Sequence, residues 1–457
     1  MEKDLALFVD ITKKLLEAEV SDPVVSPIPV EEVLQTMDLT LPDEATSDAA
    51  FAETLEQLVL TTPRTSTKLF FNQLFGGRHS RATLGELLAV MLNNSMYTYK
   101  VGGPQIIMEK LILRKFADLV GYGAEADGTL APGGSMTNLM GLIMARDYKD
   151  ERSRFDGVSK KMTVYTSDTC HYSLYKNAAF AGIGRNNMRK IKNDAHGRMS
   201  VPHLKAAIEQ DLKEGYLPTM INATAGTTVI GAFDPIREIA AVAKEHDIWL
   251  HVDGAYCGSV LFTDKYKHLV DGSELADSFT LNAHKMLGTP LSCSLITVKH
   301  KRYLYDSFSQ GADYLYQTAD DDYNPGKTSL QCGRRNDALK FWSIWKTVGT
   351  NGIGEIVDHQ FDLARHAKEY VKSNSDYTLY NDDDTIAICF NYKGIDPKLL
   401  CNKLYEEGEI MVGYGQFDGQ EFVRLVTVNF SNSKADLDAF FSKMEAFAAT
   451  HFAEVTA

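Results

Sequence analysis

Residues 235–256, PIREIAAVAKEHDIWLHVDGAY, place an amphipathic helix directly before a short apolar strand. We expect the helix over Pro235–His246, where Pro235 suits the first helical position. We expect the strand over Ile248–Val252. One face of the helix collects its apolar side chains, namely Ile236, Ile239, Ala240 and Val242 or Ala243. A helix that leads into a buried strand is the repeating unit of a parallel α/β sheet.

The same alternation extends in both directions from this stretch. Apolar, β-branched or aromatic runs bounded by turn residues predict four more strands, and one further helix is expected over Val201–Glu214. The expected strands are Met162–Thr166, Thr219–Ala223, Ser278–Leu281 and Ser292–Val298. The sequence therefore predicts the α/β class, a mostly parallel sheet with helices on both faces. In such sheets, ligands bind at the carboxyl ends of the strands.

Three zones are expected along the chain. Residues 1–80 form an N-terminal helical arm, with helices near Leu5–Glu19 and Asp48–Leu60 and an extended, proline-containing stretch at Ser21–Pro29. Residues 81–350 form the large α/β domain, and residues 351–457 form a small C-terminal α+β domain. The elements expected in the last zone are a helix over Ile353–Ser373, a strand over Ala387–Tyr392, a helix over Pro397–Glu407, strands over Ile410–Tyr414 and Phe422–Asn429, and a helix from Lys434.

Composition excludes several classes of protein. The 457 residues carry a formal charge of −14, which disfavours general binding to nucleic acid or to anionic membranes. No run approaches the roughly 18 apolar residues of a membrane span, and the charged N-terminus lacks the pattern of a signal peptide. The six cysteines are scattered without a Cys-x-x-Cys pair, so neither a disulfide framework nor a metal site is expected. We expect a cytoplasmic protein.

Two residues at predicted strand ends could carry chemistry. Lys285 follows the strand at Ser278–Leu281 among apolar residues, where burial would lower the pKa of its amine and favour Schiff-base formation. Asp253 ends the strand before it and could hold the protonated ring nitrogen of pyridoxal phosphate (PLP). Taken alone, Lys285 is better interpreted as an ordinary surface lysine at a strand end, and Asp253 could merely cap a turn.

Two further segments are weaker signals. Pro132–Met140 supplies two glycines, a hydroxyl and then a helical apolar pattern, which suits a phosphate at a helix N-terminus but also suits an ordinary turn. It fits neither a Walker loop nor a Gly-x-Gly-x-x-Gly fingerprint. His171 follows a predicted strand and could stack on an aromatic cofactor, although a lone histidine there is more often structural.

Together these segments resemble the PLP-dependent group II amino-acid decarboxylases, in the branch that holds glutamate and cysteine sulfinate decarboxylases. The resemblance runs from about Phe70 to the C-terminus and implies PLP fold-type I, the aspartate aminotransferase-like fold. It is carried by Phe70–Phe75, Pro132–Asn138, Asn222–Thr228, Gly231–Pro235, Asn282–Lys285 and Gln331–Arg335.

The resemblance also implies a role for each matching residue. Lys285 would form the Schiff base with PLP, Asp253 would pair with the ring nitrogen, and His171 and Ala255 would lie against the two ring faces. Tyr323, in the stretch Ala319–Lys327, would return a proton to the substrate α-carbon. The remaining implied contacts are Gly134, Ser135 and His284 with the phosphate, Thr228 and Asn282 with the cofactor, and Arg424 with the substrate α-carboxylate.

The predicted substrate is a small acidic amino acid. Phe75 and Ser95, with Tyr97 nearby, resemble the pockets of cysteine sulfinate and aspartate decarboxylases, and the bulky Phe75 would shorten the pocket. The products would be hypotaurine or β-alanine. Glutamate decarboxylation to GABA is the alternative within the family, transamination is less favoured, and the non-enzyme alternative is an inactive assembly partner. The resemblance implies a homodimer with shared active sites.

Overall fold

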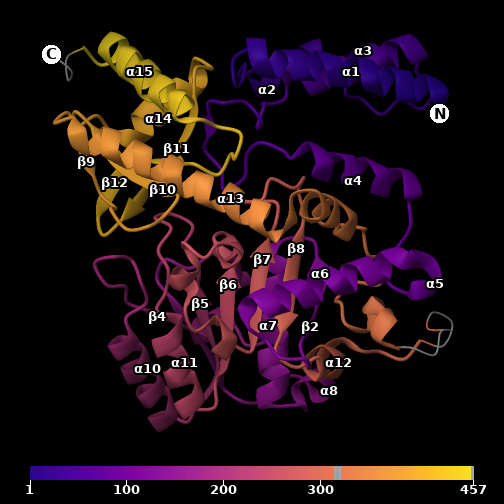
Figure 1. Ribbon diagram of the computed structural model, residues 1–457, viewed down its shortest axis with the longest axis vertical. Coiled ribbons are helices and arrows are strands. Elements are labelled where there is room, and N and C mark those ends of the chain that lie inside the picture. The colour runs from indigo at the N-terminus through magenta and orange to yellow at the C-terminus, as the bar shows by residue number, and fades with distance from the viewer. Residues whose placement is uncertain (313–315, 317–320, 454–457) are drawn as a thin grey trace. The chain divides into compact units, whose positions relative to one another are not determined.

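The computed structural model of the chain describes residues 1–312, 316 and 321–453 (Figure 1). Contacts group these residues into two compact units. The larger unit contains residues 78–362 and 381–386, and the smaller unit contains residues 1–77, 363–380 and 387–457. The first 77 residues thus belong to the same unit as the C-terminal residues. The sequence had instead suggested three consecutive zones, with boundaries near residues 80 and 350.

The larger unit is built on a seven-stranded sheet with the order β2-β8-β7-β6-β5-β3-β4. Strands β4, β3, β5, β6 and β7 are mutually parallel, and β8 is antiparallel to both of its neighbours, β7 and β2. The strands are β2 (Asp127–Ala131), β3 (Met162–Ser167), β4 (Met188–Ile191), β5 (Leu217–Thr224), β6 (Trp249–Gly254), β7 (Ser278–Asn282) and β8 (Ser294–Val298).

Burial explains why these segments form strands. Every residue of β3, β6, β7 and β8 is buried, as expected where both faces of a sheet are covered. The five strands expected from the sequence are present within a few residues of their predicted ends, so the predicted α/β class with a mostly parallel sheet is confirmed. Helix α11 (Ile236–Glu245) begins one residue later than expected, because Pro235 has a non-helical ψ of 79° and precedes the helix.

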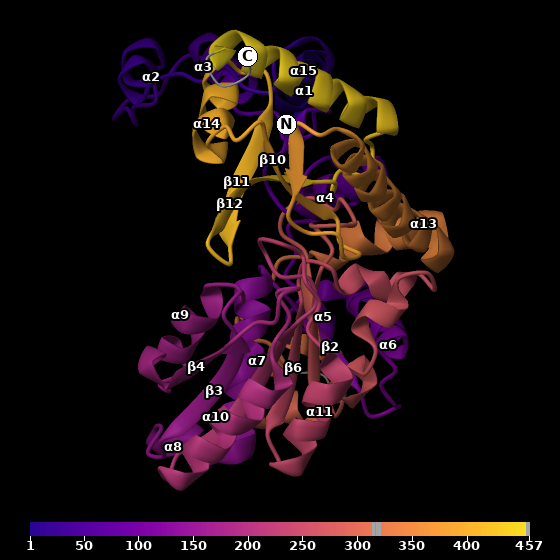
Figure 2. The same ribbon diagram turned by 90° about the vertical axis from the view of Figure 1, so that its left-hand side faces the viewer.

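Helix α7 (Gly134–Lys149) packs on the centre of this sheet, where it contacts β5 to β8. Helices α10 (Val201–Lys213) and α11 contact each other and β5. Figure 2 shows the two helices side by side. The other helices of the unit are α4 (Ser80–Leu92), α5 (Tyr99–Gly102), α6 (Pro104–Val120), α8 (Ser153–Asp156), α9 (Ser173–Phe180), α12 (Arg302–Phe308) and most of α13 (Ala338–Ser373). Short 3-10 helices are η1 (Arg185–Asn187), η2 (Gly258–Phe262), η3 (Lys267–Val270), η4 (Ser273–Leu275), η5 (Asp321–Tyr323) and η6 (Pro325–Lys327).

The smaller unit contains a five-stranded sheet with the order β1-β11-β12-β10-β9. Its strands are β1 (Phe70–Phe71), β9 (Tyr377–Leu379), β10 (Ala387–Tyr392), β11 (Met411–Phe417) and β12 (Gln420–Val426). Its helices are α1 (Glu2–Ser21), α2 (Val30–Thr36), α3 (Asp48–Thr61), α14 (Pro397–Glu406), α15 (Lys434–His451) and the end of α13. The α+β pattern predicted for the C-terminal zone is confirmed, and the two-residue strand β1 pairs in parallel with β11.

Candidate active site

The predicted chemical groups meet at one edge of the larger sheet. Strands β3, β5, β6 and β7 are parallel, so their carboxyl ends lie at the same edge. Strand β2 runs in the same direction as β7, because β8 is antiparallel to both. The N-terminus of α7, which follows β2, therefore lies at this edge too. The topology thus brings together segments that are more than a hundred residues apart.

A cavity of about 250 Å³ opens at this edge. Eight of the residues predicted for cofactor binding or catalysis line it, namely Gly134, Ser135, His171, Thr228, Asp253, Ala255, Asn282 and Lys285. Its other lining residues are Asn138, Tyr172, Thr224, Gly226 and Tyr256, which the sequence reasoning did not assign. The structure thus places the Lys285 amine and the Asp253 carboxylate in one cavity.

Lys285 has the environment that a Schiff-base lysine needs. Burial lowers the pKa of its amine, while Asp253 and Cys257 oppose that shift. The amine nitrogen lies 5.9 Å from the centre of the Tyr256 ring. Because a neutral amine is the nucleophilic form, this setting favours covalent attachment of an aldehyde.

Asp253 is held by two donors on its two oxygens. The Ala255 backbone N–H donates to Oδ1 over 3.1 Å, and the Asn138 side-chain amide donates to Oδ2 over 2.8 Å. Only 4% of Asp253 is exposed, so these donors take the place of water around the carboxylate. The two hydrogen bonds thus fix the orientation of the carboxylate in the cavity.

His251 is a buried partner that the sequence reasoning missed. Its Nε2 lies 3.0 Å from Asn138 Oδ1, and its Nδ1 lies 2.7 Å from Ser278 Oγ. Burial lowers the pKa of His251 to about 4. The alternation of side chains along a strand could have indicated this residue, since side chains at 249, 251 and 253 share one face of β6. On that face Gly141 of α7 approaches the ring so closely that a Cβ would lie 2.8 Å from His251 Nδ1.

His171 lies between the end of β3 and the start of α9. Its Nδ1 is 2.7 Å from Ser173 Oγ and accepts a hydrogen bond from the Ser173 N–H over 3.3 Å. An accepting Nδ1 leaves the proton of the neutral ring on Nε2. Burial lowers the pKa of His171, with Asp253 opposing and Lys285 adding to that effect. A neutral ring with a fixed tautomer suits stacking and proton transfer.

The residues present fit the implied PLP. The N-terminus of α7 begins at Gly134, where a Cβ would lie 2.8 Å from the Asn282 amide, so only glycine permits this approach. Asn282 Oδ1 is buried without a hydrogen-bond partner among the described residues, which leaves it available to a ligand. Helix N-termini bind phosphate through free backbone N–H groups, and here the helix has sixteen residues. Anion, amine and carboxylate sites thus lie in one cavity.

Four predicted residues of the larger unit lie outside the lining of this cavity. His284 is buried, and its Nδ1 accepts from the Cys293 N–H over 2.9 Å, so its predicted phosphate contact remains a prediction. Arg334 N–H donates to Ser95 Oγ over 3.1 Å, and Gly326 N–H donates to Tyr97 O over 2.8 Å. Tyr323 is partly exposed, with its ring centre 6.3 Å from that of Tyr99. Ala319 and Asp320, at the start of the predicted Tyr323 loop, lie outside the described residues.

The two remaining predicted residues belong to the smaller unit. Arg424, in β12, donates to the Asn72 carbonyl over 2.7 Å. Phe75 lies beside Phe70, with 6.1 Å between the ring centres. The predicted contacts of both residues with the substrate remain predictions.

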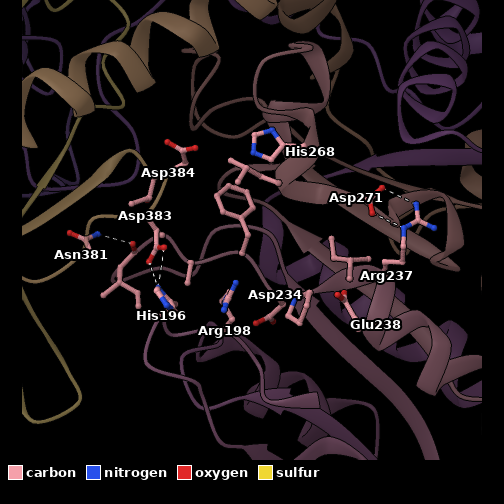
Figure 3. A pocket seen from close by; sticks show the side chains of 18 residues that line it. His196, Arg198, Asp234, Arg237, Glu238, His268, Asp271, Asn381, Asp383 and Asp384 are labelled. Atoms are coloured by element: carbon pink, nitrogen blue, oxygen red, sulfur yellow. Dashed lines mark hydrogen bonds and ion pairs between the residues drawn. The ribbon is translucent and has the colours of Figure 1, made fainter. Parts of the chain in front are cut away.

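Figure 3 shows a second cavity of the larger unit, of about 410 Å³. Two ion pairs join residues of its lining. His196 Nδ1 lies 3.0 Å from Asp383 Oδ2, and Arg237 Nε lies 2.6 Å from Asp271 Oδ2. The described residues that line it include no lysine. This cavity therefore offers no group that could form a Schiff base.

Other kinds of site find no support within residues 1–312, 316 and 321–453. That part of the chain contains no group of three or more His, Cys, Asp or Glu residues arranged to hold a metal ion. None of its helices is both long and apolar enough to cross a membrane. All six cysteines belong to the described residues and are free thiols.

Comparison with known families identifies the larger part of the chain. Residues 30–393 match the model of the pyridoxal-dependent decarboxylase conserved domain. This match includes the whole cavity described above and extends over more than half of the chain.

Curated relatives and solved structures agree with this match. The cysteine sulfinic acid decarboxylase of Homo sapiens is 34% identical over 441 residues, which cover 91% of this chain and 89% of that protein. The acidic amino acid decarboxylase GADL1 of Mus musculus is 33% identical over 471 residues, covering 97% of this chain and 84% of that protein. The crystal structure of mouse CSAD has a TM-score of 0.92 at 32% identity, covering 98% of this chain and 99% of that one. The predicted fold-type I is thereby confirmed.

Proposed function

The chain belongs to the pyridoxal-dependent decarboxylase family, and from that membership we propose that it removes CO2 from a small acidic amino acid, cysteine sulfinate or aspartate. The observation that carries the proposal is the placement of the Lys285 amine and the Asp253 carboxylate in one cavity. The relatives named for cysteine sulfinic acid and for acidic amino acids support the choice of substrate. The products would be hypotaurine and β-alanine.

We assign a part of the cofactor to each group of residues that lines the cavity. Lys285 would hold the aldehyde carbon, Gly134 and Ser135 would hold the phosphate at the start of α7, and Asp253 would face the ring nitrogen. PLP, when bound, supplies an electron sink for the bond that breaks at the substrate α-carbon. A carboxylate that is only 4% exposed would stabilise positive charge on a neighbouring group more strongly than a carboxylate in water.

Proton transfer falls to two candidate groups. The neutral His171 ring carries its proton on Nε2, so it can donate at that atom while Ser173 holds Nδ1. Tyr323 offers a phenol at the partly exposed helix η5. We assign the return of a proton to the substrate α-carbon to one of these two residues, and release of the amine product to Lys285.

Substrate selection is assigned to Arg424 and Phe75. A guanidinium presents two parallel N–H donors that match a planar carboxylate, which suits Arg424 for the α-carboxylate that is lost. A phenylalanine at position 75 would shorten the pocket and crowd the extra methylene of glutamate. Ser95 and Tyr97 complete the proposed pocket.

A homodimer with shared active sites follows from the same family membership. Helix α4 supports it, because a row of its apolar side chains is 39 to 55% exposed in this chain. These side chains are Leu84, Leu87, Leu88, Val90, Met91 and Leu92. An exposed apolar face of this kind suits the self-complementary interface of a symmetric dimer. A second copy would also explain how Ser95, Tyr97 and Tyr323 serve a site whose cavity they do not line.

A cytoplasmic location completes the proposal. Six free cysteines, four of them buried, suit a reducing compartment. The acidic charge of −14 disfavours nucleic acid and anionic membranes as partners.

Substrate profiling of the PLP-loaded protein tests this function. CO2 release is measured from cysteine sulfinate, aspartate and glutamate at equal concentrations, with keto-acid formation followed in parallel. We expect kcat/KM to be higher for either short acid than for glutamate, and no keto acid. A preference for glutamate would overturn the pocket assignment, and keto acid without CO2 would point to transamination.

A further inference from the structure

A continuous chain of buried hydrogen bonds leads from the indole of Trp249 to the carboxylate of Asp253. Trp249 Nε1 lies 2.9 Å from Ser278 Oγ, which lies 2.7 Å from His251 Nδ1. His251 Nε2 lies 3.0 Å from Asn138 Oδ1, and Asn138 Nδ2 lies 2.8 Å from Asp253 Oδ2. All five residues are at most 4% exposed. The chain joins β6, β7 and α7 beneath the cavity.

The direction of each bond follows from the two ends of the chain. An indole nitrogen can only donate, so Ser278 Oγ accepts from Trp249. A carboxylate can only accept, so the Asn138 amide turns its NH2 group toward Asp253 and its oxygen toward His251. The neutral His251 ring therefore carries its proton on Nε2, donates to Asn138 Oδ1 and accepts the Ser278 hydroxyl proton at Nδ1.

The opposite polarity would change the protonation of Asp253. If His251 carried its proton on Nδ1, its Nε2 would accept from the Asn138 NH2 group. Asn138 Oδ1 would then face the Asp253 carboxylate, and two oxygens at that distance require a proton between them. A protonated Asp253 could no longer stabilise positive charge on a ring nitrogen.

We propose that Trp249, Ser278, His251 and Asn138 form a one-way hydrogen-bond relay that holds the Asn138 amide as a donor to Asp253, the acceptor that would face the cofactor ring. The four are positioning residues, since they act through Asp253, and the inference rests on the proposed PLP chemistry. The lowered pKa of His251, which burial brings to about 4, is consistent with a neutral ring at physiological pH. Lys285 and His171, which line the cavity with Asp253, are not members of the relay.

The tautomer of His251 provides a test that requires no catalysis. The full-length protein is labelled with 15N-histidine, and nitrogen chemical shifts of its twelve histidines are recorded with and without PLP. The His251 signals are assigned by their loss in His251→Gln. We expect Nε2 to be protonated and Nδ1 to be an acceptor in both states. A proton on Nδ1, or a charged ring at neutral pH, would overturn the relay.

Ser278→Ala provides the second test, with Ser259→Ala as its matched control. Both serines are fully buried, but Ser259 Oγ has no hydrogen-bond partner among the described residues. We expect Ser278→Ala to weaken PLP binding about three- to tenfold and to lower kcat by a similar factor, with KM for the amino acid within about twofold. Ser259→Ala should leave all three within about twofold. Equal behaviour of the two variants would contradict the proposal.

Trp249→Phe tests the part of the indole. Without its N–H, one lone pair of Ser278 Oγ is left without a donor, so the hydroxyl is held less firmly toward His251 Nδ1 and the His251 signals should report a mixture of tautomers. Unchanged tautomers in Trp249→Phe would refute the part assigned to Trp249. The tautomer and PLP-binding measurements do not depend on turnover. If the proposed substrate is wrong, the wild-type protein will therefore show the expected His251 tautomer but release no CO2 from that substrate.

Discussion

Asn138 donates a 2.8 Å hydrogen bond to Asp253 although 115 positions separate the two residues in the chain. Asn138 lies one helical turn after Gly134 on α7, and Asp253 lies near the end of β6. The bond therefore connects the helix proposed to bind the phosphate to the group proposed to face the cofactor nitrogen. Whatever moves one of these residues also changes the surroundings of the other.

Replacing Asn138 by aspartate should impair the cofactor site. Asn138→Asp puts a second carboxyl group within hydrogen-bond distance of Asp253, and two such groups cannot both stay ionised at low cost. We expect PLP binding to weaken by about tenfold and kcat to fall by about a hundredfold. Spectroscopic titration with PLP and CO2 release measure the two effects. Thr137→Ser, on the same helix, is the control, and equal losses in both variants would argue against a specific role for Asn138.

Replacing Lys285 should remove covalent cofactor attachment. Lys285→Arg keeps a positive charge but lacks an amine that can form a Schiff base, so the visible absorption band of bound PLP and CO2 release should both be lost. Borohydride reduction followed by peptide mapping should label residue 285 in the wild type. The exposed Lys205→Arg variant should keep both properties. A label at another lysine would disprove the assignment.

Acid should destabilise the folded protein in part through His251. Burial lowers its pKa from 6.5 to about 4, so the unfolded chain binds more protons between these values and stability falls as pH drops through them. This pKa difference corresponds to a change of at most about 3 kcal/mol in the free energy of unfolding. Chemical unfolding of wild type and His251→Gln from pH 7 to pH 4 measures it, with the variant losing less stability on acidification.

The comparison of variants is needed because other buried groups titrate in the same range. Burial raises the pKa of Asp234 to about 7, which makes stability change in the opposite direction over that interval. His300→Gln, at an exposed position, should retain the pH dependence of the wild type. Parallel curves for wild type and His251→Gln would show that His251 takes up its proton at the same pH in the folded and unfolded states.

Shortening the side chain at position 75 should relax substrate choice. Phe75→Ala removes the ring that is proposed to crowd longer acids, so kcat/KM for glutamate relative to cysteine sulfinate should rise by about tenfold. Steady-state kinetics with the two acids measure the ratio. Phe155→Ala, at an exposed phenylalanine of α8, should leave the ratio unchanged. An unchanged ratio in Phe75→Ala would place the selectivity elsewhere.

A charge on the exposed face of α4 should break the proposed dimer. Leu88 is 49% exposed, and Leu88→Asp would bury a carboxylate if this face is an interface. Sedimentation velocity should then show a monomer with little activity. Leu212→Asp, at a leucine of α10 that is 47% exposed, should remain dimeric. A dimeric Leu88→Asp protein would exclude this face as the interface.

The sequence predicted the parts of the molecule that depend on local pattern. Apolar runs located the strands, and because parallel strands end at one edge, Asp253, His171 and Lys285 could be expected to lie together before any coordinates were known. Strand β1 was beyond this reasoning, since two residues carry no periodicity and Phe70–Phe71 forms a strand only through pairing with β11.

The relay partners were missed for a different physical reason. In the sequence, Asn138 is only part of a predicted helix start and His251 only part of an apolar run. Each becomes a candidate functional residue only once the hydrogen bond between them is known. Alternation in β6 already placed His251 and Asp253 on one face, so a buried polar pair was foreseeable there. That Asn138 of α7 is the partner of His251 could be seen only in three dimensions, where Gly141 packs against the His251 ring.

The glycine at position 141 gives helix α7 a property that reaches beyond packing. With no side chain there, the helix rests directly on an imidazole, and its distance from the sheet cannot shrink further. The same helix carries the proposed phosphate site at its N-terminus and, one turn later, the Asn138 amide that donates to Asp253. The helix would therefore fix the distance between the bound phosphate and the ring nitrogen of PLP. An analogue of PLP whose phosphate arm is one methylene longer should therefore bind poorly, although it carries the same chemical groups.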